Sequence, residues 1–153
     1  MDNHLTFWQE FWHFADIVHS KPYERVLDKP DNAMDDLPFK WFDGALLNYS
    51  ENLLRFDDDK VALYSFGEAF KQVKSLTFKQ LRENVRQIQV ALRAHGVGKG
   101  DCVVGYLPNA IECAQIKLAV ISLGAIWSCT SPDFGPNVTE SLLLFYFGLL
   151  SLF

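Results

Sequence analysis

The sequence predicts an α/β fold, an incomplete mixed/parallel sheet with flanking helices. A strand, a helix and a second strand are expected in that order over residues 101–129, the order of a parallel β-α-β unit. An amphipathic helix is expected over residues 77–95. The 153 residues are 49% hydrophobic and 22% charged, which is typical of a globular domain with a buried core. We predict an N-terminal helix and extended linker segment (1–60), a hairpin, helix and β-α-β unit (61–136), and a divergent hydrophobic tail (137–153).

The first 60 residues are expected to contain one aromatic helix. Thr6 followed by Gln9 has the pattern of a capping box that opens a helix. Four apolar residues then recur at helical spacing, namely Phe7, Phe11, Phe14 and Val18. We interpret this stripe as a docking face for the rest of a protein. Residues 19–40 are expected to form an extended, acidic surface segment, because prolines interrupt the helical pattern. A turn at Asp43-Gly44 and a short helix ending near Arg55 follow.

Residues 61–96 predict a hairpin followed by a long helix. A strand over 61–66, a turn over 67–72 and a returning strand over 73–76 are typical of an antiparallel pair. Thr77 with Gln80 forms a second capping-box pattern. The helix behind it carries an unbroken apolar stripe, formed by Phe78, Leu81, Val85, Ile88 and Leu92. We expect the helix to end at His95-Gly96, with Gly96 as a left-handed cap.

Residues 101–129 predict a parallel β-α-β unit. A buried strand over 101–107 leads to a sharp turn at Pro108-Asn109, where Asn109 is expected to cap the next helix. That helix, over 110–123, is apolar nearly all round and should lie against a sheet. A second strand begins after Gly124. Two strands do not complete a parallel sheet, so the chain is expected to be the beginning of a domain.

The residues alone indicate no catalytic, cofactor-binding or metal-binding site. The net charge of −5 argues against a nucleic-acid partner. Residues 68–99 carry seven Lys and Arg against two Glu; we interpret them as a solvated helix face, the alternative being a contact with a phosphate-rich partner. The glycine-rich residues 96–101 follow a helix and open a strand, so they predict a helix cap and a turn and not a phosphate loop. The widely spaced cysteines are expected to be reduced and mostly buried thiols; they are Cys102, Cys113 and Cys129.

Three segments in order resemble the adenylate-forming acyl-CoA synthetases. The first, over residues 41–52, is similar to the segment before the main domain in the acetyl-CoA synthetase branch. The second runs from Leu76-Thr77-Phe78 through residues 96–101 to Pro108-Asn109. The third, over residues 124–135, ends in Ser-Pro-Asp-Phe-Gly. The resemblance covers roughly residues 1–136, and it depends on the ordered combination of the three segments.

The resemblance implies that the chain starts the large N-terminal domain of an adenylate-forming enzyme, an ATP-dependent acid–thiol ligase of the cytosol. A full-length member would use ATP, CoA and Mg with small-molecule substrates only. The family's phosphate loop, acidic motif and lysine come later in its sequence, so no catalytic residue is carried over. We therefore expect this fragment to bind none of these cofactors and to be inactive alone. The alternative is a non-catalytic regulatory or interaction fragment that binds the full-length enzyme or another partner.

The tail departs from the family pattern near residue 137. Residues 141–153 carry no charge and are too few to span a bilayer, which needs roughly 20 residues. We expect no stable membrane span, and we interpret the tail as that of a truncated isoform or an incomplete record. A membrane-associating or partner-binding tail is the alternative, and self-association through it is a further expectation.

Overall fold

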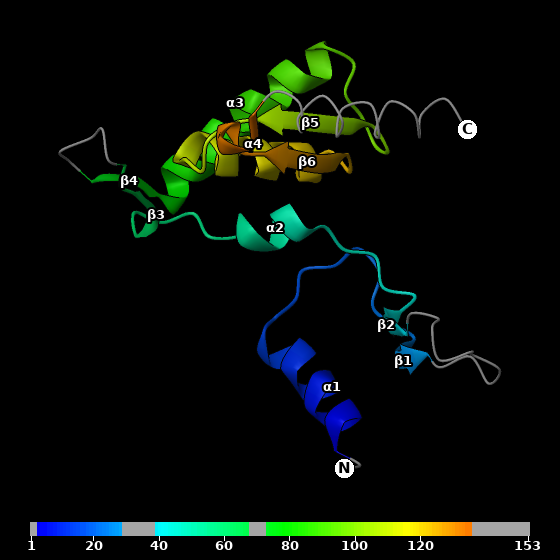
Figure 1. The fold of residues 1–153 in the computed structure, drawn as a ribbon. Helices are drawn as coiled ribbons and strands as arrows, with labels where there is room; N and C mark the ends of the chain where they lie inside the picture. The colour runs from blue at the N-terminus through cyan, green and yellow to red at the C-terminus, as the bar shows by residue number, and fades with distance from the viewer. Residues whose placement is uncertain (1–2, 29–38, 68–72, 136–153) are drawn as a thin grey trace. The chain divides into compact units, whose positions relative to one another are not determined.

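A computed structural model describes residues 3–28, 39–67 and 73–135 (Figure 1). The chain divides into two compact units, Met1–Asn52 and Leu53–Phe153. The hydrophobic tail lies outside the described residues. The predicted turn over 67–72 also lies outside them, except for its first residue. None of the helices in the described ranges has the length and apolar character needed to cross a bilayer.

The first unit is built around one buried tryptophan. Its elements are α1 (His4–Phe14), β1 (Arg25–Asp28), β2 (Lys40–Asp43) and the start of α2 (Tyr49–Leu53). β1 and β2 pair antiparallel. Trp12 is only 6% exposed, and its ring centroid lies 4.7 Å from that of Phe42 and 5.2 Å from that of Tyr23. Trp12 is therefore the buried aromatic contact of α1, and Trp8 adds a second contact with Trp41 of β2, with ring centroids 5.7 Å apart.

Two predictions for α1 are wrong in detail. The helix begins at His4 with Asn3 in the capping position, so Thr6 already lies inside the first turn and cannot act as the cap. The helix ends at Phe14, before Val18. The strand β1 lies within residues 19–40, which were expected to be an extended surface segment, and it pairs with β2.

Asn52 ties the chain after α1 to α2. Its side-chain oxygen accepts a hydrogen bond from the Val18 N–H at 2.8 Å, and its side-chain nitrogen donates to the Val18 carbonyl at 2.9 Å. Both backbone groups of one residue are thus satisfied by a residue 34 positions away. The short predicted helix is confirmed, although it ends at Leu53 and not at Arg55.

The second unit follows the predicted order of elements. These are β3 (Val61–Ser65), β4 (Lys74–Thr77), α3 (Phe78–Ala94), β5 (Cys102–Tyr106), α4 (Ile111–Ser122), β6 (Ile126–Thr130) and a short 3-10 turn, η1 (Pro132–Phe134). β3 and β4 pair antiparallel, and β5 and β6 pair parallel. The predicted hairpin and β-α-β unit are confirmed. In the described residues the two strand pairs remain separate two-stranded sheets.

The core of this unit lies between α3 and α4. Leu81 and Val85 of α3 are 4% and 1% exposed, and they pack with Leu118 and Ala119 of α4. Half-buried apolar side chains surround these four; they are Leu54, Ala62, Leu63, Ile88 and Leu92. The apolar stripe read from the sequence is therefore the face that α3 buries.

The two ends of α3 match the prediction. The Gln80 N–H donates to the Thr77 hydroxyl oxygen at 3.2 Å, and the Thr77 N–H donates to the Gln80 side-chain oxygen at 3.0 Å. This reciprocal pair is a complete capping box. At the other end Gly96 adopts φ +85°, which glycine reaches without a Cβ penalty. By contrast, α4 begins at Ile111 with Ala110 in the capping position, so Asn109 lies one residue too early and the predicted cap is wrong.

Candidate functional site at the carboxyl edge of the parallel strands

β5 and β6 end together, which creates one carboxyl edge. Their register runs from Cys102↔Ile126 to Tyr106↔Thr130, and the Leu107 N–H donates to the Thr130 carbonyl at 3.2 Å. In open α/β sheets, ligands bind outside the carboxyl ends of the parallel strands. This edge is therefore the candidate functional site of the second unit.

Polar groups at this edge mostly bond to one another. The Tyr106 hydroxyl donates to the Pro132 carbonyl at 3.3 Å. The Ser131 hydroxyl donates to the Asp133 carboxylate at 2.8 Å and accepts from the Asp133 N–H at 3.3 Å. Thr130 is only 4% exposed, and its hydroxyl has no hydrogen-bond partner in the part of the chain that the structure describes. The edge is thus an ordered turn with one buried hydroxyl left over.

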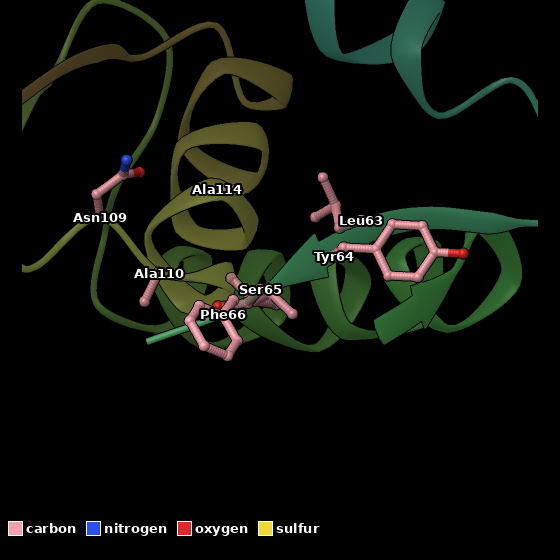
Figure 2. Close-up of a pocket in the computed structure, with 8 residues that line it drawn as sticks. Leu63, Tyr64, Ser65, Phe66, Asn109, Ala110 and Ala114 are labelled. Carbon is pink, nitrogen blue, oxygen red and sulfur yellow. The ribbon is translucent and has the colours of Figure 1, made fainter. Parts of the chain in front are cut away.

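A shallow hollow of about 270 Å³ lies beside this edge, between the end of β3 and the start of α4 (Figure 2). Its lining is Leu63, Tyr64, Ser65, Phe66, Asn109, Ala110, Ile111 and Ala114. Figure 2 shows the Tyr64 ring directed away from Asn109 and Ala110, and Tyr64 is 73% exposed. None of the eight lining residues carries a charged side chain, so the hollow is lined by apolar and neutral groups.

The hollow does not fit a nucleotide triphosphate with its metal ion. Phosphates are held by cations and by clusters of backbone N–H groups, and no Lys or Arg lines the hollow. A second, apolar hollow of about 500 Å³ between α3 and α4 likewise has no Lys or Arg in its lining. Within the described ranges no group of three His, Cys, Asp or Glu side chains could hold a metal ion.

The glycine-rich residues 96–101 form a cap and a turn, as predicted. The Gly98 N–H donates to the Asp101 carboxylate at 2.7 Å, and the Gly100 N–H donates to the Gly124 carbonyl at 3.0 Å. These amides are bonded within the fold, so they are not arranged to receive a phosphate.

The basic stretch is a solvated helix face, as predicted. All four basic side chains of α3 are exposed, namely Lys79, Arg82, Arg86 and Arg93. Arg86 pairs with Glu83 through two hydrogen bonds of 2.7 and 2.8 Å. The hydrogen bond from Arg86, with a second from Gln87, lowers the pKa of Glu83 to about 2.

In the first unit a hydrogen bond to Asp43, followed by attraction to Asp28, raises the pKa of Arg25.

The prediction that the cysteines are mostly buried is wrong for one of them. Cys102 and Cys113 are half-buried, whereas Cys129 is exposed. The structure also places the Sγ atoms of Cys113 and Cys129 only 3.7 Å apart. Nothing in the sequence signals this approach, because the two residues are 16 positions apart on different elements.

Two protein-family models match the chain. The acetyl-coenzyme A synthetase N-terminus model matches residues 1–53, and the AMP-binding enzyme model matches residues 50–143. The chain belongs to the AMP-binding enzyme family. The α/β fold class and the resemblance to the adenylate-forming acyl-CoA synthetases are thereby confirmed.

Individual relatives make the similarity more specific. The chain is 48% identical over 136 residues to acetoacetyl-CoA synthetase of Mus musculus and 47% identical over 138 residues to that of Danio rerio. These alignments cover 88% and 90% of this chain and 20% of each relative. The solved structure of acetoacetyl-CoA synthetase from Streptomyces lividans matches with a TM-score of 0.75 at 35% identity, covering 87% of this chain and 20% of that one. The chain therefore spans about a fifth of the length of these relatives.

Proposed function

We propose that this chain is the N-terminal portion of an acetoacetate–CoA ligase. Such an enzyme converts ATP, acetoacetate and CoA into acetoacetyl-CoA, AMP and pyrophosphate. The observation that carries the proposal is the 48% identity to a mouse acetoacetyl-CoA synthetase over 136 of the 153 residues. The order of the two family models, N-terminal segment first and AMP-binding region second, supports it. The whole enzyme would act in the cytosol on small-molecule substrates with ATP, CoA and Mg.

In this proposal the chain supplies scaffold and not reacting groups. Residues 61–136 are the first part of the adenylation domain, and residues 1–60 are its N-terminal linker. The parallel pair β5–β6 would be part of a larger sheet on which α3 and α4 pack. Further strands of that sheet would pair with the edges of β5 and β6 that are unpaired among the described residues. The acyl pocket and phosphate contacts would come from other segments.

A chimera tests the ligase assignment. Residues 1–135 of this chain would replace the aligned segment of mouse acetoacetyl-CoA synthetase, and the aligned segment of an acetyl-CoA synthetase would serve as the control insert. We expect the first chimera to retain acetoacetate-dependent pyrophosphate exchange. The exchange rate of the control chimera should be at least tenfold lower. Equal activity from both inserts would remove the support for an acetoacetate enzyme over other family members.

We also propose that the 153-residue chain does not adenylate acetoacetate by itself. The support is the lining of its two described hollows, which offers a triphosphate no cation. The test is acetoacetate-dependent exchange of labelled pyrophosphate into ATP with the purified chain, and full-length mouse enzyme as the positive control. Exchange above the rate of an enzyme-free blank would refute this part of the proposal and leave the family assignment intact.

An interaction fragment is the second candidate, and one observation favours it. Phe7, Phe11 and Phe14 of α1 are 58%, 43% and 85% exposed, although helical aromatic residues usually bury most of their surface. The candidate predicts that the chain co-purifies with full-length enzyme and that Phe11→Asp abolishes the association. Gln9→Asp adds the same charge at an exposed position of the same helix and should leave it unchanged. Equal loss in both variants, or no co-purification, would eliminate this candidate.

A further inference from the structure

Two cysteine sulfurs lie close together where the start of α4 approaches the end of β6. Cys113 lies in the first turn of α4 and Cys129 is the penultimate residue of β6. Their Sγ atoms are 3.7 Å apart, close to van der Waals contact. A disulfide requires about 2.0 Å, so side-chain movement of about 1.7 Å would bring the sulfurs to bonding distance. The third cysteine, Cys102, lies in β5 and takes no part in this contact.

The two thiols differ in their access to solvent. Cys129 is an exposed residue, which favours its reaction with a small oxidant in solution. Cys113 is half-buried. Burial, followed by the hydrogen bond with Cys129, raises the pKa of the Cys113 thiol, and the positive charge of Lys117 opposes the shift. One sulfur is therefore placed for first attack and the other for the second step.

We propose that Cys113 and Cys129 form a dithiol modification site that hydrogen peroxide converts into an intramolecular disulfide. In the first step the Cys129 thiolate attacks one peroxide oxygen, the O–O bond breaks, and hydroxide leaves. In the second step the Cys113 sulfur attacks the sulfur of the Cys129 sulfenic acid, the S–O bond breaks, and water leaves with the Cys113 proton. Overall, two thiols are oxidised to one disulfide, and one peroxide is reduced to two waters.

The inference is independent of the proposed ligase function. Neither Cys113 nor Cys129 lines the hollow beside β3 or the hollow between α3 and α4. The crosslink would join the start of α4 to the end of β6 and would close the segment between them into a loop. The test therefore needs no substrate and no enzyme activity.

The experiment counts thiols in the full 153-residue chain. The reduced, folded protein is treated with limiting hydrogen peroxide, the peroxide is removed with catalase, and the protein is unfolded in guanidinium chloride with N-ethylmaleimide. Intact mass then gives the number of alkylated thiols, and peptide mapping identifies the disulfide. We expect the count to fall from three to one, with Cys102 as the alkylated residue.

The controls separate proximity from general reactivity. Cys102→Ser should still form the Cys113–Cys129 disulfide at the wild-type rate, whereas Cys113→Ser and Cys129→Ser should form no intramolecular disulfide. Wild-type chain oxidised while unfolded should yield all three possible cysteine pairings. A single pairing in the folded chain would therefore depend on the fold. Retention of three alkylated thiols in the folded chain would overturn the proposal. A disulfide that includes Cys102, or sulfinic acid at Cys129 with Cys113 still alkylated, would overturn it as well.

Discussion

Removing the Thr77 hydroxyl should destabilise α3 from its N-terminus. In Thr77→Ala the Gln80 N–H loses its side-chain acceptor, at 3.2 Å in the wild type. The reverse bond, from the Thr77 N–H to the Gln80 side-chain oxygen, uses only the backbone of residue 77 and survives the substitution. The β4 pairing of Thr77 with Val61 is also a backbone interaction and is kept. The change therefore isolates one half of a capping box.

The size of the effect follows from this geometry. Loss of a Ser or Thr cap costs about 0.5–2 kcal/mol, typically about 1 kcal/mol. Since the cap is exposed and water can replace the lost acceptor, we expect about 1 kcal/mol for Thr77→Ala. This free energy corresponds to a roughly fivefold change in the opening equilibrium of α3.

Native-state hydrogen exchange followed by mass spectrometry measures this opening. Peptides that cover residues 78–94 should exchange roughly fivefold faster in Thr77→Ala than in the wild type. Thr6→Ala is the matched control, because Thr6 has the same local sequence pattern but lies inside α1. Since Ala is the better helix former, exchange from α1 should be unchanged or slower in that variant.

Two outcomes would contradict this reasoning. Unchanged exchange from α3 in Thr77→Ala would mean that the cap contributes nothing to the helix. Faster exchange from α1 in Thr6→Ala would mean that Thr6 caps that helix after all, against the position of Asn3.

Two further predictions concern side chains of α3. Val85→Ala should destabilise the second unit by about 2 kcal/mol, because Val85 is 1% exposed and two methyl groups leave the core. Val90→Ala, 55% exposed on the same helix, should cost nothing in urea unfolding; equal losses would contradict the assigned core. Glu83 has a folded pKa of about 2, below its ordinary 4.5, so its pairing contributes to folding above pH 4.5 and is lost as the pH falls toward 2. Arg86→Gln should raise the Glu83 pKa toward 4.5 in an NMR titration, and an unchanged pKa would contradict the pairing.

Sequence reasoning worked best where every signal was local. For α3 all signals lie within 20 residues: the cap marks the start of the helix, the C-terminal glycine marks its end, and the apolar stripe runs between them. The parallel pairing of β5 and β6 was also predictable, because a strand, a crossover helix and a second strand impose it. For α1 the local signals were degenerate, since a Thr-x-x-Gln pattern occurs just inside the true helix start.

The candidate site was less accessible from the sequence. Its position at the carboxyl edge follows from the β-α-β order, but its lining does not. The hollow joins the end of β3 to Asn109 and its neighbours, more than 40 residues further along the chain. The family assignment came from ordered short segments and not from any reacting group.

The sequence by itself determined the bounds of α3 and the absence of a phosphate loop in residues 96–101, because each depends on residues close together in the chain. It also determined the order of the elements and the family, because both follow from short local segments and their order along the chain. Only the tertiary structure decided that Trp12 is buried while Phe7 and Phe11 are exposed. It also brought the sulfurs of Cys113 and Cys129 within 3.7 Å. Helical periodicity defines a stripe but not what covers it, and side-chain proximity between distant elements depends on how those elements pack.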